Sequence, residues 1–144
     1  MPALDVTGWM NGKVQQPKDT KGKVVVVDFY ATWCGPCMRA IPHNNELLKK
    51  YQDKGLAIIG VCTSSRGQEN MPATVKSKGI EYPTARDPDL KSEKAWAVNY
   101  YPTYAIVDRK GIVRAIGLQP DYVERVVQKL LAEPAPSVST QAKN

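Results

Sequence analysis

The sequence predicts an α/β domain in which helices flank a central mixed β-sheet. Two observations support this: short apolar strands alternate with helical segments, and the chain closes with a hairpin followed by a helix. Of the 144 residues, 42% are hydrophobic and 24% are charged, which is typical of one globular domain with its own core. We expect an N-terminal arm at residues 1–22, the domain at residues 23–132 and a disordered tail at residues 133–144, which is rich in Pro and Ser.

The first strand and the first helix follow each other directly. Four consecutive valines in the segment 24–30 are typical of a strand that is buried on both faces. A helix is expected to begin at Cys34 or Gly35 and to continue to Tyr51, because Pro36 fits a first turn, where its missing N–H costs nothing. The two cysteines therefore lie at the start of this helix, directly after the loop at residues 31–33.

The rest of the domain is expected to supply four more strands and three more helices. The strands are expected at residues 56–62, 80–86, 103–107 and 112–117, and the helices at residues 68–78, 92–98 and 122–131. The segment 108–111 ends in Gly and predicts a hairpin turn, so that the last two strands are antiparallel. The arm is expected to form at most a short pair of strands.

Charge and hydropathy argue against two classes of function. The net charge is +6, but Lys and Arg are scattered among acidic residues, so we expect a solvated surface and no nucleic-acid partner. No apolar run approaches the roughly 20 residues of a membrane span. The first residues lack a basic region followed by an apolar stretch, so no signal peptide is visible.

Cys34 and Cys37 carry the predicted chemistry. Two cysteines three positions apart at a helix start lie about one turn from each other, close enough for a disulfide. The unpaired N–H groups and the positive end of the helix dipole favour the thiolate, which is the form that attacks disulfides. We expect Cys34, at the tip, to be the exposed nucleophile, and the deeper Cys37 to resolve the mixed disulfide, without metal or organic cofactor.

Other interpretations of the two cysteines remain. A C-x-x-C pair can be half of a zinc site, but such a site needs four ligands and only Cys62 and His43 remain as candidates. We expect Cys62 to be a small buried hydrophobe and His43 to be exposed without a role. The alternative function is a non-catalytic binding or metal-chaperone module. A peroxidase would need a Pro-x-x-x-Thr-x-x-Cys context, which the segment 31–34 lacks.

Residues around the pair complete the predicted site. Burial in an apolar strand is expected to raise the pKa of Asp28, which then takes the proton of Cys37; the alternative is a carboxylate bonded to loop amides. Trp33 is expected to shield the dithiol and offer a docking surface, or simply to pack. The bond from Tyr101 to Pro102 is expected to be cis and to face the first cysteine, leaving the Tyr101 backbone free to pair with substrate; the alternative is a trans turn.

These motifs together resemble a known family. The segment 27–37 resembles the active-site segment of thioredoxins, and Tyr101-Pro102-Thr103 resembles their cis-proline loop. Asp28 matches the family's buried acid and Pro42 its helix-kink proline. The resemblance covers residues 22–132. It implies a thioredoxin fold, and it implies Trp33, Gly35, Pro36, Tyr101 and Pro102 as the residues that bind substrate.

An inserted helix and strand at residues 68–86, before the cis-proline loop, resemble the TlpA/ResA type of this family, as does the arm at residues 9–12. This resemblance implies a reductase of disulfides in proteins, apocytochromes c among them, that is recharged by an upstream dithiol donor. It also implies an extracytoplasmic or periplasmic location, with any membrane tether outside this sequence; we expect a monomer. Gly35-Pro36 is the pair typical of reducing thioredoxins. Ala40 stands where ResA-like proteins have an acid. Gly60 stands near the position where thioredoxins have a lysine.

Overall fold

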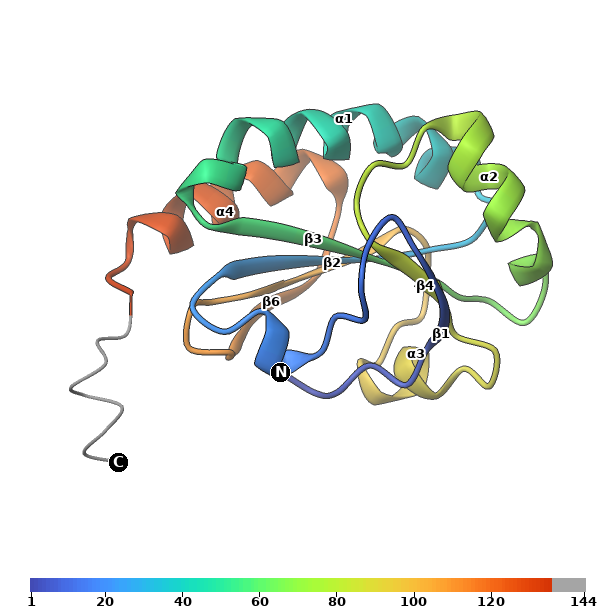
Figure 1. The fold of residues 1–144 in the computed structure, drawn as a ribbon, viewed down its shortest axis with the longest axis horizontal. Coiled ribbons are helices and arrows are strands. Elements are labelled where there is room, and N and C mark those ends of the chain that lie inside the picture. Colours follow the sequence, from blue (N-terminus) through green and yellow to red (C-terminus); the bar gives the residue numbers. More distant parts are fainter. Residues whose placement is uncertain (136–144) are drawn as a thin grey trace.

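The computed structural model describes residues 1–135, so most of the tail that we expected to be disordered, residues 136–144, lies outside the described residues. Six strands form one sheet with the order β1-β4-β3-β2-β5-β6 (Figure 1). The strands are β1 (Thr7–Met10), β2 (Val24–Tyr30), β3 (Leu56–Cys62), β4 (Thr84–Arg86), β5 (Thr103–Val107) and β6 (Val113–Leu118). The helices are α1 (Gly35–Tyr51), α2 (Met71–Lys78), α3 (Lys91–Ala95) and α4 (Pro120–Ala132), with short 3₁₀ turns at Pro17–Asp19, Gln52–Lys54 and Gln68–Asn70.

The sheet is mixed, as the sequence predicts. Strands β2, β3 and β4 are parallel, whereas β1 pairs antiparallel with β4, β5 with β2, and β6 with β5. All seven residues of β2 are buried, which confirms that the run of valines marks a central strand. The prediction of an α/β fold with a mixed sheet is therefore confirmed.

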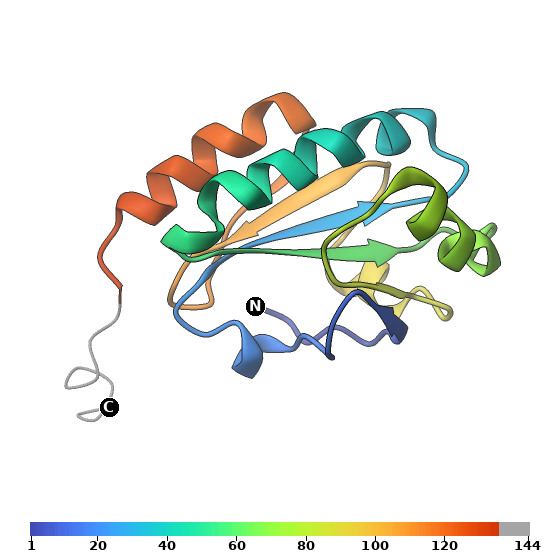
Figure 2. The same cartoon turned by 45° about the horizontal axis from the view of Figure 1, so that its top comes forward.

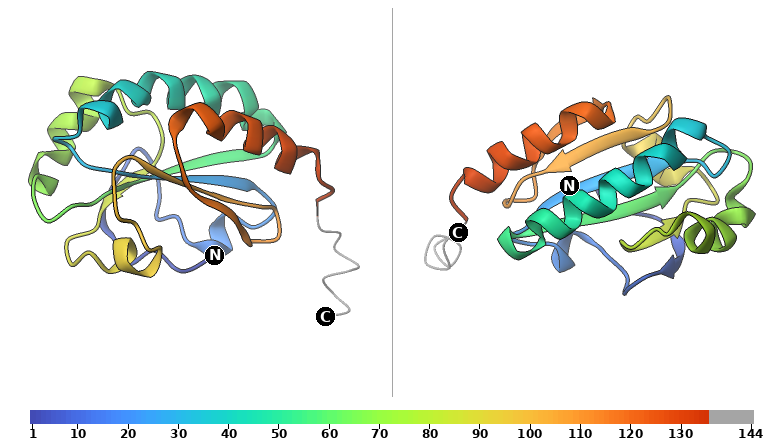
Figure 3. Two further views of the ribbon diagram at one scale, coloured as in Figure 1. Left: turned by 180° about the vertical axis from the view of Figure 1, so that it is seen from behind. Right: turned by 90° about the horizontal axis from the view of Figure 1, so that it is seen from above.

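The helices form unequal layers on the two faces of the sheet. Helices α1, α2 and α4 cover one face, while α3 and the N-terminal segment cover the other (Figures 1 and 2). Seen from above in Figure 3, α1 and α4 lie side by side across the sheet. Because side chains of a strand alternate between faces, Val26, Asp28 and Tyr30 all point toward the layer that contains α1. The dithiol helix and the buried acid thus share one face.

Several element boundaries differ from those expected. The arm contributes β1 to the large sheet, where it pairs with β4 instead of forming a separate pair of strands. Helix α3 stops at Ala95, short of the expected residue 98, because Ala97 has a positive φ of 55°. Helix α4 begins two residues early, because Pro120 fits a first turn. Among residues 1–135, no helix is both long and apolar enough to cross a membrane.

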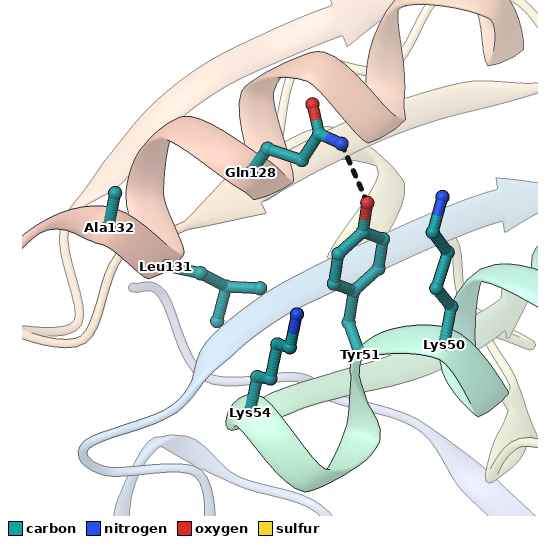
Figure 4. A pocket seen from close by; sticks show the side chains of 6 residues that line it. All are labelled: Lys50, Tyr51, Lys54, Gln128, Leu131 and Ala132. Atoms are coloured by element: carbon teal, nitrogen blue, oxygen red, sulfur yellow. Dashed lines mark hydrogen bonds between the residues drawn. The ribbon is translucent and has the colours of Figure 1, made fainter.

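A hollow of about 600 Å³ lies where the C-terminal end of α1 meets α4 (Figure 4). The Tyr51 hydroxyl accepts a hydrogen bond from Gln128 Nε2 at 2.7 Å and donates one to Glu124 Oε2 at 2.7 Å. At 1.5 Å per residue, Tyr51 lies about 20 Å along α1 from Cys37. These contacts join the two helices, and the hollow is separate from the dithiol.

Candidate active site

The structure joins Cys34 and Cys37 in a disulfide with a Cα–Cα distance of 5.2 Å. Cys34 is the N-cap of α1, and its Sγ accepts a hydrogen bond from the backbone N–H of Cys37 at 3.2 Å. Pro36 occupies the first turn, and helix α1 continues through Pro42 to Tyr51. The sulfur of Cys34 therefore accepts a hydrogen bond from one of the first N–H groups of the helix. In the reduced protein this contact favours a thiolate over a thiol.

The two cysteines differ little in exposure. Cys34 has 5% of its surface exposed and Cys37 2%. The prediction that Cys34 is exposed is therefore wrong for the disulfide form, although the order of the two cysteines is as predicted. The exposed residues are those on either side of Cys34, since Trp33 is 48% exposed and both Gly35 and Pro36 are exposed. A substrate would therefore first meet Trp33 and the Gly35-Pro36 turn.

Asp28 is 2% exposed and lies in the middle of the sheet. Its Oδ2 accepts hydrogen bonds from Asn44 Nδ2 at 3.2 Å and from the Tyr82 hydroxyl at 3.4 Å. Its Oδ1 has no hydrogen-bond partner among the described residues. Burial raises the pKa of this carboxyl group to about 7, against the lowering effect of the Tyr82 hydroxyl. Asp28 is therefore poised to gain or lose a proton near neutral pH.

Side chains from three elements surround this acid. Asn44 comes from α1, Tyr104 from β5 and Tyr82 from the segment just before β4. The Tyr104 hydroxyl donates to Asn44 Oδ1 at 3.1 Å, and Asn44 Nδ2 also approaches the Tyr82 hydroxyl at 3.3 Å. All three residues are buried, and no loop amide of the described chain bonds to Asp28. We call Asp28, Asn44, Tyr82 and Tyr104 the buried polar cluster.

Sequence reasoning missed the two partners of Asp28, Asn44 and Tyr82, and also Tyr104, which bonds to Asn44. One signal was present, because Asn44 lies seven residues after Cys37 and so falls on the same buried face of α1. A polar side chain in that apolar stripe needs a buried partner. Nothing in the local sequence marks Tyr82 or Tyr104, whose roles depend on which strands become neighbours.

The structure leaves little room for a side chain at Gly60, the position where the resemblance to thioredoxins places a lysine. Gly60 pairs directly with Asp28 across β2 and β3. A Cβ atom at Gly60 would lie 2.8 Å from Thr84 Oγ1, closer than real Cβ contacts, and 3.1 Å from Tyr82 Cε2, which is tighter than most of them. Thr84 and Tyr82 therefore fill the space that a side chain at Gly60 would occupy. The Tyr82 hydroxyl serves as a polar partner of Asp28.

The loop before β5 lies against residues 31–34, which connect β2 to α1 and which we call the dithiol loop. The Tyr101 ring packs edge-on against Trp33, with ring centroids 5.9 Å apart and an interplanar angle of 80°. The peptide bond between Tyr101 and Pro102 is cis, and Pro102 is buried. The Tyr101 hydroxyl donates to Glu93 Oε1. The predicted substrate-binding residues Trp33 and Tyr101 are thus brought together.

The loop after β3, residues 63–67, also contacts the dithiol loop. Trp33 Nε1 donates to Ser64 Oγ at 3.1 Å, and the Thr32 hydroxyl donates to the Gly67 carbonyl at 2.7 Å. A hollow of about 550 Å³ lies beside these contacts, and Thr32 and Trp33 form part of its lining. Sequence reasoning assigned no role to this loop.

The third cysteine and the histidine take no part in the site. Cys62 is fully buried, and burial raises the pKa of its thiol to about 12. His43 is exposed on α1. Within residues 1–135, no group of three or more His, Cys, Asp and Glu side chains is placed to hold a metal ion.

Comparison with the sequences of known proteins identifies the family and the relatives of this chain. A family model described as Redoxin matches residues 1–131. The chain belongs to the Redoxin family. It is 34% identical over 124 residues to the thiol-disulfide oxidoreductase ResA of Bacillus cereus, covering 84% of this chain and 71% of ResA. It is also 38% identical over 143 residues to the protein DipZ of Mycobacterium tuberculosis, but the match spans only 21% of DipZ.

Solved structures agree on the fold of this Redoxin member. A putative thiol:disulfide interchange protein DsbE from Chlorobium tepidum superposes with a TM-score of 0.80 at 27% identity, covering 91% of this chain and 94% of that one. A thiol-disulfide isomerase from Corynebacterium glutamicum also gives a TM-score of 0.80, at 23% identity, with 92% and 97% covered. The predicted thioredoxin fold and the resemblance to ResA-type proteins are confirmed.

Proposed function

We propose that this chain is a thiol-disulfide oxidoreductase that reduces disulfides in proteins through a Cys34–Cys37 dithiol/disulfide cycle. The observation that carries the proposal is the pair itself, which forms a disulfide at the N-terminus of α1 with a backbone N–H bonded to Cys34 Sγ. The similarity to ResA, whose name states this activity, supports it.

The cycle balances with two electrons and two protons. The Cys34 thiolate attacks one sulfur of the substrate disulfide, so that a mixed disulfide forms and the other substrate sulfur leaves as a thiolate. Cys37 then attacks Cys34 Sγ, forming the intramolecular disulfide and releasing the second substrate thiolate. The substrate is reduced by two electrons and the pair is oxidised by two. An upstream dithiol donor returns the electrons by the reverse exchange, and no bound metal or organic cofactor is needed.

Asp28 is proposed to accept the proton that Cys37 loses when it attacks. Its pKa of about 7 suits a base that must accept and release protons near neutral pH. Its Oδ1, which accepts no hydrogen bond from residues 1–135, can take that proton. Asn44 and Tyr82 hold the other oxygen, so they are positioning residues in this scheme.

The substrate surface is proposed to consist of Trp33, Gly35, Pro36, Tyr101 and Pro102. The exposed face of Trp33 and the Gly35-Pro36 turn receive the substrate beside Cys34. The backbone of Tyr101, before the cis-proline, pairs with an extended substrate segment. We further propose a monomer that works outside the cytoplasm, in the periplasm where the cell has one, with any membrane tether outside this sequence and with apocytochromes c among its substrates.

Insulin reduction with dithiothreitol separates this proposal from a non-catalytic binding or metal-chaperone module. The wild-type chain should accelerate precipitation of the insulin B chain, and Cys34→Ser should not. Cys62→Ala is the matched control, because this buried cysteine lies outside the cycle and its loss should leave the acceleration in place. No acceleration by the wild-type chain over dithiothreitol alone would favour the binding module.

A further inference from the structure

Two guanidinium groups lie on either side of Cys34. The Arg66 guanidinium stacks over the Trp33 ring, with Cζ 4.7 Å from the ring centroid. A Cβ atom placed on Gly35 would lie 3.2 Å from Arg39 Nη1. Since Trp33 precedes and Gly35 follows Cys34, one positive charge lies near each neighbour of the cysteine. We call Arg39 and Arg66 the arginine pair.

Both arginines are available to a partner. Each is exposed, and neither forms an ion pair with any residue of the described chain. Arg66 is held in place because its loop is tied to the dithiol loop by the bonds from Trp33 to Ser64 and from Thr32 to Gly67. The arginine pair is therefore a feature of the redox site and is not balanced by charges of its own.

Two glutamates lie near the arginine pair, and only one of them, Glu69, is exposed. The first turn of α1 contains no acidic residue, so its positive end adds to the field of the arginine pair. Glu93 is half-buried and accepts hydrogen bonds from Tyr101 and Thr63. Glu69 is exposed and lines the same hollow of about 550 Å³ as Arg66, so it opposes one arginine in part. The exposed surface beside Cys34, where substrate is proposed to bind, thus has excess positive charge.

We propose that the arginine pair selects disulfides whose cysteines are flanked by aspartate or glutamate in an extended segment of the substrate protein. This inference rests on the proposed reductase function and specifies its substrate class. Carboxylates within a few residues of the attacked sulfur would reach Arg66 on the Trp33 side and Arg39 on the Gly35 side. Substrate segments with Lys or Arg at these positions would be repelled by the same two charges.

The test uses disulfide-linked dimers of short peptides in which the cysteine is flanked by Glu, Gln or Lys. Second-order rates of reduction by the reduced chain are divided by the rates with dithiothreitol, which removes differences in intrinsic peptide reactivity. Exposed ion pairs are individually weak, and replacing two attractions by two repulsions predicts about a tenfold preference for the Glu peptide over the Lys peptide at low salt. At about 1 M salt, where the Debye length falls to about 3 Å, the preference should largely disappear.

The variants assign the preference to these two residues. Arg39→Gln/Arg66→Gln should bring the Glu-to-Lys rate ratio close to one, and Arg39→Glu/Arg66→Glu should invert it. Arg125→Gln is the matched control, because it removes an exposed arginine from α4 near the far end of α1 and should keep the wild-type ratio. A wild-type ratio near one, or a double Gln variant with the wild-type ratio, would overturn the inference while insulin reduction remains intact. A wild-type chain that reduces neither peptides nor insulin contradicts the proposed function itself, and the substrate class with it.

Discussion

Replacing Asp28 with Asn should change how the stability of the oxidised protein depends on pH. The carboxyl group is buried, and its pKa is raised from 3.8 to about 7 in the folded chain. Between these two values the folded state binds a proton that the unfolded state has released. Ionised Asp28 therefore destabilises the fold, and wild-type stability falls as the pH rises from about 4 to about 7.

The size of this effect follows from the shift. A difference of about three pKa units at roughly 1.4 kcal/mol per unit corresponds to a loss of roughly 4 kcal/mol, nearly complete by pH 8. The amide side chain of the Asp28→Asn variant has no proton to lose, so this loss should be absent. Other carboxyl groups contribute equally to both proteins and cancel in the difference.

Urea unfolding of both disulfide-bonded proteins at a series of pH values from 4 to 8 measures this difference. The free energy of unfolding of Asp28→Asn minus that of the wild type should grow by roughly 4 kcal/mol across the series. The same variant should slow the release of reduced substrate at neutral pH, since Cys37 loses its proton acceptor. A difference in stability that stays constant within about 1 kcal/mol across the series would refute the assignment of a raised pKa to Asp28.

Two further predictions concern residues around the site and the core. Tyr82→Phe removes a hydroxyl that lowers the pKa of Asp28, so a carbon-detected NMR titration should place that pKa higher than in the wild type. The control Tyr51→Phe, about 20 Å along α1 from Cys37, should leave the pKa of Asp28 unchanged, and a lower value in Tyr82→Phe would contradict the expectation. Arg109→Met leaves three backbone carbonyl groups without their donor and should cost about 2–4 kcal/mol in urea unfolding. The control Lys49→Met removes one exposed ion pair, with Glu81, and should cost at most about 1 kcal/mol; equal costs would count against this ranking.

Much of the fold could be predicted because its signals are local. Four valines in succession mark β2 without any knowledge of its neighbours, and Pro36 and Gly55 lie just inside the start and just after the end of the segment that contains α1. The position of Asp28 inside that strand was enough to predict its burial and the direction of its pKa shift. Each inference needed only residues close together in the sequence.

The parts that could not be predicted depend on contacts between distant segments. Tyr82 reaches Asp28 only because β4 lies beside β3, and β1 joins the sheet only because β4 leaves an edge for it. The low exposure of Cys34 likewise depends on how its loop packs in the fold, which its position at a helix tip does not reveal. Arg66 lies beside the redox site because its loop, which is distant from Trp33 in the sequence, is bound to Trp33 through Ser64.

The most direct test of the dithiol cycle is to trap its covalent intermediate. Reduced Cys37→Ser is incubated with a disulfide-linked peptide, and the adduct is located by mass spectrometry after digestion without reductant. Without the resolving thiol, the mixed disulfide should persist, with the peptide attached to Cys34, and reduced Cys34→Ser should form little adduct under the same conditions. An adduct on Cys62, or faster capture by Cys37 in the Cys34→Ser variant, would contradict the assignment of Cys34 as the attacking sulfur.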